Sequence, residues 1–460
     1  MDAQRSVVGL VAGILAVPAP AAADPPVCGP PVVSTTQPGY TVADPDCDVN
    51  GTPFVPVNGS SVWTGITDGA AYRIEKPADW NGELVLYAHG YRGLGTTVFV
   101  DSPSLRAHYL SRGFAWAASS YATNGYDVGQ GVRDSYTLID RFKERTGLRA
   151  RSVYMTGASM GGHVTAVAIE EHPQAFVGAM PVCGVLGDAE LFDYFLDANV
   201  TAAALTGTAI TFPKAPVDPS FQEVYRQQVA RQVPLLGQGA GLTALGRTWG
   251  DFVEQRSGGT RPGFDNAIAY WSALPGIPPL TTVPFLFGVY PGLSGGTAGI
   301  AEGNLTSNRF TLYQSDDSPW LSRDELRVNR DVLRVDRTDR PSRDLSGVPR
   351  VDGRPRVPVL SMHTIGDLFV PLSMEQEYAR RAALQGRGKL FVSRAVRALG
   401  HCEFTVPELA QGFDDLVSWV RTGHRPAGDA ILDRRAVAAD DFGCRFTLTQ
   451  RPTFGAACPA

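Results

Sequence analysis

The sequence predicts an α/β fold in which helices cover both faces of a mostly parallel β-sheet. Short apolar segments bounded by glycine alternate with amphipathic segments in two parts of the chain, residues 69–185 and 351–425. The chain has 460 residues, of which 43% are hydrophobic and 19% charged, so it can bury a large core. Because strands and helices alternate, we expect parallel strands joined by crossover helices.

Residues 1–23 have the pattern of a signal peptide. The short apolar run "VVGLVAGILAV" precedes "PAPAAAD", where Ala21 and Ala23 supply the small residues of a cleavage site. The run is shorter than the ~20 residues that span a bilayer, so we expect a secreted chain, extracellular or periplasmic, without a stable membrane anchor. The net charge of -5 offers no basic footprint, and we expect no nucleic-acid partner.

An exported chain with several cysteines is expected to form disulfides. The six cysteines are Cys28, Cys47, Cys183, Cys402, Cys444 and Cys458. Spacing favours Cys28 with Cys47 and Cys444 with Cys458, because each pair closes a short loop. Residues 24–68 would then be a disulfide-closed arm and residues 426–460 a disulfide-closed tail. Six cysteines allow 15 pairings, so the connectivity stays open.

The first α/β part, residues 69–185, begins with two predicted strands, Glu83–Tyr91 and Phe114–Tyr121. A helix is expected over Gly131–Thr146, because its apolar residues share one face and Gly147 follows as a stop. The segment "SVYMTG" then predicts a strand, and "GGHVTAVAIEEHP" predicts a helix that its final proline ends.

The alternation stops in residues 186–350, which predict a large insertion. Residues 322–344 are rich in Arg and Asp and predict a solvated surface, because interleaved opposite charges create no field of one sign. Aromatic residues in the insertion would mostly form its own small core, although they also fit an acyl or aryl pocket. They include Phe192, Tyr194, Phe195, Trp249, Tyr270, Trp271 and Trp320.

The second α/β part, residues 351–425, returns with a predicted strand over Val357–Thr364. Ser373 and Gln376 have capping-box spacing and predict the start of a helix that reaches Gln385. The segment "LFVSRAV" predicts another strand. Thr405 and Glu408 form a second capping-box pattern ahead of a helix with one apolar face.

The spacing G-x-S-x-G occurs around Ser159 and again around Ser294. A serine hydroxyl is a weak nucleophile, so it needs a nearby base and an exposed position on a tight strand-to-helix turn. Ser159 follows a predicted strand and precedes a predicted helix. The glycines after Ser294 disfavour a helix. The sequence therefore predicts Ser159 as a nucleophile and Ser294 as a loop residue.

The acid and the base are expected downstream, in loops at the ends of later strands. Asp367 follows the strand predicted at residues 357–364 and fits an orienting acid, with a turn residue as the alternative. His401 fits the base, because imidazole titrates near neutral pH; the alternative is a structural histidine. The backbone N–H groups of Tyr91 and Met160 are the expected oxyanion donors.

Together, "AHGY", "GASMGG", the "GD" that ends at Asp367 and the "GHC" around His401 resemble the α/β-hydrolase superfamily over roughly half the chain. The resemblance implies a mostly parallel eight-stranded sheet, a Ser-Asp-His triad in that order, and a lid after the sixth strand, here residues 186–350. The "HC" pair also resembles the tannase and feruloyl esterase family, in which that cysteine is bonded to one immediately before the serine. Ala158 occupies that position here; if Cys402 is bridged, Cys183 is the available partner.

These features predict a secreted serine hydrolase that cleaves small-molecule or polymeric carboxylic esters through an acyl-enzyme. The mechanism needs no cofactor. We expect no metal, because "DCDVNG" has only part of a calcium loop and lacks the terminal Glu. A serine peptidase or acyltransferase remains open, because the triad does not select the acceptor. A non-catalytic binding protein of this fold is a third hypothesis. The sequence leaves the oligomeric state undetermined.

Overall fold

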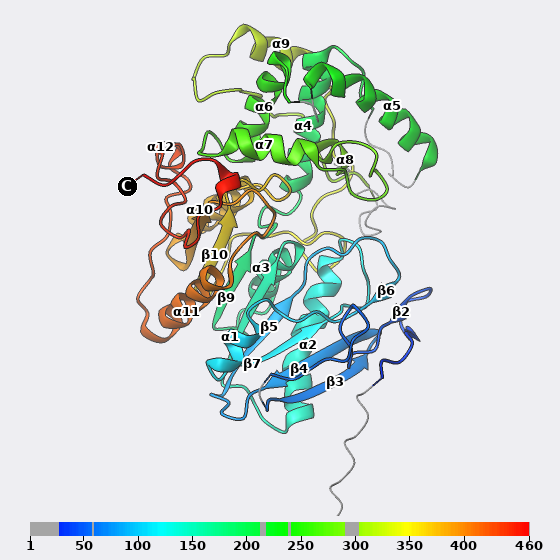
Figure 1. Ribbon diagram of the computed structural model, residues 1–460, viewed down its shortest axis with the longest axis vertical. Helices are drawn as coiled ribbons and strands as arrows, with labels where there is room; N and C mark the ends of the chain where they lie inside the picture. The colour runs from blue at the N-terminus through cyan, green and yellow to red at the C-terminus, as the bar shows by residue number, and fades with distance from the viewer. Residues whose placement is uncertain (1–26, 58, 212–217, 238–240, 290–302, 460) are drawn as a thin grey trace, which may run out of the picture.

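The computed structural model describes residues 27–459, apart from 58, 212–217, 238–240 and 290–302. The predicted signal peptide, residues 1–23, and the loop serine Ser294 lie outside the described residues. In the described part, an eight-stranded sheet runs in the order β11-β10-β9-β8-β5-β7-β4-β3 (Figure 1). A small second sheet has the order β1-β2-β6.

The eight-stranded sheet is mostly parallel, as predicted. Only the pairs β3–β4 and β4–β7 are antiparallel. Its strands are β3 Ser61–Thr67, β4 Ala70–Lys76, β5 Glu83–Ala88, β7 Ala115–Ser119, β8 Ser152–Ala158, β9 Gly178–Val182, β10 Val359–Thr364 and β11 Phe391–Val396. The small sheet has β1 Val32–Val33, β2 Thr41–Val42 and β6 Thr97–Val98. The edge strand β3 comes from the segment expected to form the N-terminal arm.

Helices cover both faces of the sheet, and each face has its own apolar core. Val132 on α2, Val164 on α3 and Tyr378 on α10 belong to one buried cluster. Tyr109 on α1 and Phe413 on α11 belong to the other. The helices are α1 Arg106–Ser111, α2 Val128–Thr146, α3 Met160–Glu171, α10 Ser373–Leu384, α11 Val406–Thr422 and the short α12 Arg434–Val437. Two 3₁₀ turns, η1 Gly388–Leu390 and η2 Pro452–Phe454, complete this part.

Of the two predicted ends of α2, only the C-terminal end is correct. Gly147 follows the helix with φ 72°, the left-handed conformation that glycine adopts without steric cost. The helix begins at Val128 rather than Gly131, because the Asp127 side chain accepts a hydrogen bond from the N–H of Gln130 and caps it.

Of the two predicted capping boxes, one is present. Thr405 and Glu408 cap α11 reciprocally. The box predicted at Ser373 and Gln376 is wrong, because Ser373 is already helical and the side-chain amide of Gln376 donates to distant carbonyl oxygens. Those acceptors are Gly258 and Ile431, at 2.9 and 3.0 Å. The Gln376 side chain therefore binds residues distant in the sequence instead of capping its own helix.

The segment between β9 and β10, called the β9–β10 segment below, is helical and gathers at one end of the sheet (Figure 1). Its helices are α4 Glu190–Thr206, α5 Pro219–Leu236, α6 Ala244–Ser257, α7 Phe264–Ala273, α8 Phe285–Gly288 and α9 Arg323–Asp331. Of its seven aromatic residues named above, five are buried and two, Tyr270 and Trp320, are exposed. Most of them therefore pack into the interior.

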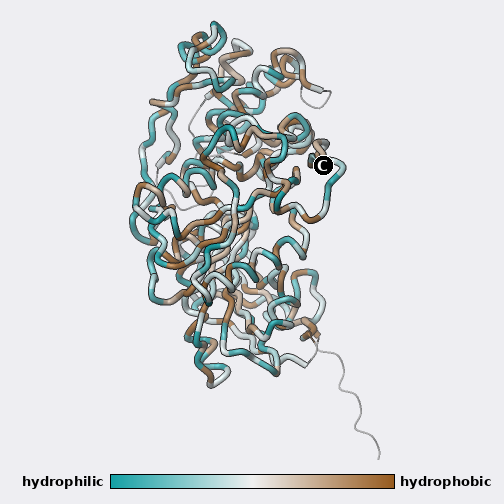
Figure 2. The backbone as a smooth tube through the Cα atoms, turned by 90° about the vertical axis from the view of Figure 1, so that its left-hand side faces the viewer, coloured by the Kyte–Doolittle hydropathy of each residue, from teal (hydrophilic) through white to brown (hydrophobic). Residues whose placement is uncertain are grey.

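Hydropathy along the chain agrees with this packing. In Figure 2, polar and apolar stretches alternate closely along the tube. Within the part of the chain that the structure describes, no helix combines the length and the hydrophobicity needed to cross a bilayer.

The loop that partly resembles a calcium site is built around an internal cation. The buried guanidinium of Arg73 lies 2.9 Å from a carboxylate oxygen of Asp48 and donates to the carbonyl oxygens of Pro45 and Cys47. Burial lowers the pKa of Arg73, and the ion pair with Asp48 opposes that change. The carbonyl and carboxylate oxygens of this loop therefore bind the positive charge of Arg73.

Candidate active site

The predicted site residues follow four strands of the same sheet. Tyr91 comes after β5, Ser159 after β8, Asp367 after β10 and His401 after β11. These four strands are parallel, so their carboxyl ends lie at one edge of the sheet. That edge is where open α/β sheets bind ligands.

Ser159 occupies a strained turn between β8 and α3. Its φ and ψ are 59° and -124°, values that residues other than glycine rarely adopt. The flanking glycines are required by close backbone contacts. A Cβ on Gly157 would lie 2.2 Å from the carbonyl oxygen of Gly161, and one on Gly161 would lie 2.1 Å from that of Ala88. The G-x-S-x-G spacing thus lets strand, turn and helix approach closely.

The two predicted oxyanion donors belong to segments that border Ser159. Met160 is the first residue of α3, where a backbone N–H has no acceptor within the helix. Tyr91 is half-buried and directly follows Gly90. The backbone at Gly90 lies close to Ser159, because a Cβ added to Gly90 would be 3.1 Å from the Cβ of Ser159. Both N–H groups therefore come from backbone beside the hydroxyl.

A buried histidine that the sequence analysis did not predict supports the Tyr91 loop. The ring of His89 stacks on Tyr121 with centroids 3.8 Å apart. Its Nδ1 lies 2.7 Å from the carbonyl oxygen of Gly90, and its Nε2 lies 3.0 Å from that of Ser120. Burial, aided by the nearby Arg92, lowers the pKa of His89 to about 3, so the ring is neutral. Its position in "AHGY", directly before the loop, was the available sequence signal.

Asp367 and His401 are hydrogen-bonded to each other. The distance from His401 Nδ1 to Asp367 Oδ2 is 2.6 Å. The other carboxylate oxygen of Asp367 accepts from the backbone N–H groups of Phe369 and Val370 at 2.8 and 3.1 Å. Asp367 is fully buried, whereas the His401 side chain is 18% exposed. The carboxylate is therefore fixed, and the imidazole reaches the surface.

The loops that carry these two residues are joined along their backbones. The acid loop, residues 365–370, begins with the N–H groups of Ile365 and Gly366, which both donate across at 2.9 Å. Their acceptors are the carbonyl oxygens of Val396, the last residue of β11, and of Ala398 in the histidine loop, residues 397–405. An added Cβ on Gly366 would lie 2.6 Å from the Ala398 oxygen, so this close approach requires glycine.

The structure has disulfides Cys28–Cys47, Cys183–Cys402 and Cys444–Cys458. The second bond connects the histidine loop to the end of β9. It also brings His401 toward the serine turn, because the N–H of Ser159 donates to Val182, the residue before Cys183, at 3.0 Å.

His401 Nε2 lies 3.6 Å from the Cys402 sulfur. Of the hydrogen bonds among the described residues, none joins Ser159 Oγ to His401. Catalytic hydrogen bonds are often longer without substrate and tighten in the complex.

Each of the other histidines named below has a structural partner or is exposed. One of them, His363, also contacts the acid loop, because its Nε2 lies 2.7 Å from the carbonyl oxygen of Val370. His163 is buried between the Tyr126 hydroxyl, 3.0 Å away, and the carbonyl oxygen of Pro349. His363 pairs with the buried Glu375 at 3.3 Å. Burial disfavours its charge, but Glu375 outweighs burial and raises the pKa of His363. His108 contacts Asp414, and His424 is exposed.

No protein-family model matches the chain. An o-phthalyl amidase from Xanthobacter agilis is 24% identical over 422 residues, which cover 79% of this chain and 87% of the amidase.

Among solved structures, feruloyl esterase B from Aspergillus oryzae is 14% identical with a TM-score of 0.46, covering 87% of each chain. An esterase from Aspergillus oryzae is 12% identical with a TM-score of 0.47, covering 87% of this chain and 86% of its own.

Proposed function

We propose that this protein is a serine hydrolase that cleaves carboxylic esters through an acyl-enzyme formed on Ser159. One observation carries the proposal. A non-glycine residue in a strained strand-to-helix turn, Ser159, lies at the sheet edge that also carries the Asp367–His401 pair. Strain of this kind persists where function requires it. The turn exposes the hydroxyl, and the pair supplies a base with a fixed tautomer.

In the proposed reaction, Ser159 Oγ attacks the acyl carbon while His401 Nε2 takes its proton. Asp367 holds the Nδ1–H and stabilises the imidazolium that forms. The N–H groups of Tyr91 and Met160 stabilise the oxyanion of the tetrahedral intermediate. His401 then protonates the leaving alcohol. Water, deprotonated by the same imidazole, attacks the acyl-enzyme, and the imidazolium returns its proton to Ser159 Oγ as the acid leaves. Each proton transfer uses a group of this chain.

Amide cleavage is the second candidate, and the amidase relative favours it. The acyl-enzyme and its hydrolysis would be the same for an ester and an amide. The difference lies in acylation, because the amine leaves only after His401 has protonated it. Hydrolysis rates for an ester and an anilide with the same acyl group would separate the two.

The test compares two serines with the same local spacing. Ser159→Ala is expected to lower kcat for p-nitrophenyl esters by at least about 10⁴-fold, as removal of a triad nucleophile does. It should also abolish labelling by a fluorophosphonate probe. Ser294→Ala is the matched control and is expected to keep both. Retained activity and labelling in folded Ser159→Ala would overturn the proposal.

We also propose a secreted protein, with residues 1–23 removed and residues 186–350 acting as a lid over the α/β parts 69–185 and 351–425. The three disulfides support secretion, because such bonds persist in oxidising compartments. The arm, residues 24–68, and the tail, residues 426–460, each carry one of them. Mass spectrometry of the mature protein from its own culture medium tests both the cleavage and the bonds.

A further inference from the structure

The β9–β10 segment contacts the acid loop through a buried guanidinium. Arg261, between α6 and α7, is 4% exposed, and its Nε donates to the carbonyl oxygen of Ile365 at 2.7 Å. The other two guanidinium nitrogens form hydrogen bonds within the β9–β10 segment. Nη1 donates to the carbonyl oxygen of Gly259 at 2.9 Å, and Nη2 donates to the hydroxyl of Ser257 at 3.0 Å. Arg261 therefore has one fixed geometry, and Ile365 lies two residues before Asp367.

A buried indole connects both loops at once. Trp271 on α7 is 4% exposed. Its single N–H is shared by the carbonyl oxygens of Gly366 and Leu399, each 2.9 Å away. Gly366 directly precedes Asp367, and Leu399 lies two residues before His401. The position of the Trp271 indole is thus coupled to the distance between the acid loop and the histidine loop.

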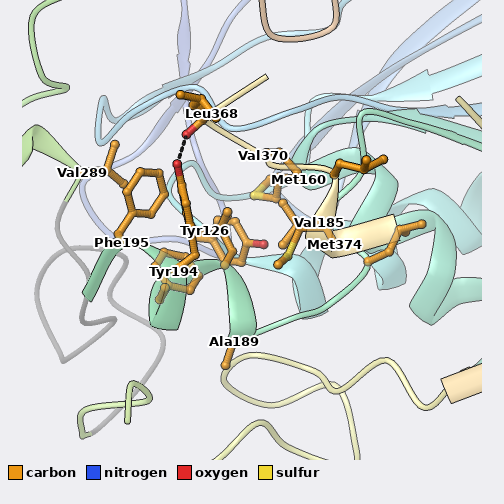
Figure 3. Packing of buried hydrophobic residues seen from close by; sticks show 14 of the residues in the cluster. Tyr126, Met160, Val185, Ala189, Tyr194, Phe195, Val289, Leu368, Val370 and Met374 are labelled. Atoms are coloured by element: carbon orange, nitrogen blue, oxygen red, sulfur yellow. Dashed lines mark hydrogen bonds between the residues drawn. The ribbon is translucent and has the colours of Figure 1, made fainter. Parts of the chain in front are cut away.

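A tyrosine of α4 adds a third contact on the other side of Asp367. The hydroxyl of Tyr194 donates to the carbonyl oxygen of Leu368 at 3.3 Å, the bond drawn in Figure 3. Tyr194, Phe195, Leu368 and Val370 belong to the same buried apolar cluster (Figure 3). The acid loop therefore accepts hydrogen bonds from the β9–β10 segment both before and after Asp367.

We propose that Tyr194, Arg261 and Trp271 are positioning residues that hold the acid and histidine loops at the separation where Asp367 meets His401; the inference rests on the proposed function. None of the three contacts Asp367 or His401 by a hydrogen bond of its own. They act through backbone carbonyl oxygens of the two loops. Removal of these side chains would leave those oxygens buried without the donors that now bind them. The β9–β10 segment then aligns the catalytic pair in addition to its proposed role as a lid.

The test removes one N–H and keeps the ring. Trp271→Phe is expected to lower kcat by about 10- to 100-fold with little change in KM, because small displacements of catalytic groups reduce the rate without altering substrate contacts. The pH profile of kcat/KM should change as well, which a loss confined to folding stability would not produce. The downfield proton resonance of His401 Nδ1–H should weaken or disappear.

Trp249→Phe is the matched control. Trp249 lies in α6, is fully buried, and donates its indole N–H to the carbonyl oxygen of Ala198 at 2.8 Å, away from both loops. The Trp249→Phe variant loses the same kind of hydrogen bond, from an indole N–H to a backbone carbonyl oxygen, in the same segment. Equal kinetics and an equal pH profile in Trp271→Phe and Trp249→Phe would overturn the inference.

A second pair of variants decides the question if Trp271→Phe does not fold. Arg261→Lys keeps the charge but loses the planar guanidinium that reaches Ile365, and it should show the same kcat loss and the same change in the pH profile. Its control is Arg256→Lys, since Arg256 pairs with the buried Asp197 at 2.6 Å within the β9–β10 segment. Matching behaviour of the two lysine variants would refute the positioning role. The Nδ1–H resonance tests alignment without any substrate, so failure of the proposed function would be seen separately, in Ser159→Ala.

Discussion

Replacing Asp367 by asparagine tests the proposed tautomer control of His401. Asparagine has the same shape but offers one oxygen and one NH₂ group. The structure determines which way it would turn. The oxygen that now accepts from Phe369 and Val370 makes two hydrogen bonds. Turning the amide nitrogen toward those donors would lose both bonds, at a cost of about 3 kcal/mol for two acceptor bonds of this kind.

The amide nitrogen of Asp367→Asn should therefore face His401. The NH₂ group would donate to Nδ1, which must then be unprotonated, and the ring proton moves to Nε2. A ring in that tautomer cannot take the proton of Ser159. The expected loss in kcat is about 10⁴-fold, the size of this tautomer effect in serine proteases, or about 5 kcal/mol of activation free energy.

The assay is hydrolysis of a p-nitrophenyl ester by purified parent and variant, with folding checked by circular dichroism. Asp193→Asn is the matched control, because Asp193 on α4 is also a buried carboxylate that accepts a backbone N–H, from Ser307 at 2.7 Å. Burial raises the pKa of Asp193 well above its usual range, so asparagine resembles its neutral form. Folded Asp367→Asn with kcat within about tenfold of the parent, or no lower than Asp193→Asn, would refute the reasoning.

Three further predictions concern the site and its support. Gly161→Ala should lower the free energy of unfolding by about 1–3 kcal/mol through overpacking and abolish ester hydrolysis, because its Cβ meets the end of β5; urea unfolding and the esterase assay check this. Replacing Cys183 and Cys402 together by alanine should cost up to about 5 kcal/mol, given the 219-residue separation, and lower kcat; unchanged unfolding and kcat would exclude a role for the bond. Burial lowers the pKa of His163 to about 4, below its unfolded value of about 6.5, so its stabilising contribution is complete above pH 6.5 and is lost as pH falls toward 4. His163→Gln should reduce this acid destabilisation by about 2 kcal/mol between pH 6.5 and 5, whereas His424→Gln, at an exposed site, should leave it unchanged.

Local patterns in the sequence predicted features whose causes are themselves local. The strand, turn and helix around Ser159 were predictable because the glycine spacing, the preceding apolar run and the following apolar face lie within about two dozen residues. The same holds for the glycine stop of α2 and the capping box at Thr405 and Glu408, where both partners of each contact lie within one helical turn.

The capping box expected at Ser373 failed for the opposite reason. The amide of Gln376 bonds to carbonyl oxygens 118 and 55 residues away in the chain, and nothing near Ser373 signals them. Such long-range partners override local preference when they satisfy more buried polar groups. The omission of β3 has a different cause, because its partner is local. β3 pairs with β4 across the two-residue turn Asp68–Gly69, and this Asp-Gly pair was an available hairpin signal.

The sequence by itself determined the chemistry that is available: a serine on a predicted sharp turn, a carboxylate and an imidazole after later strands, and six cysteines whose pairing stayed open. Only the tertiary structure decided how these groups meet. The contact between Asp367 and His401, and the shared indole N–H of Trp271 beneath them, join residues separated by 34 to 128 positions. Such contacts depend on the order and twist of the strands and on helix packing, which no local pattern of residues encodes.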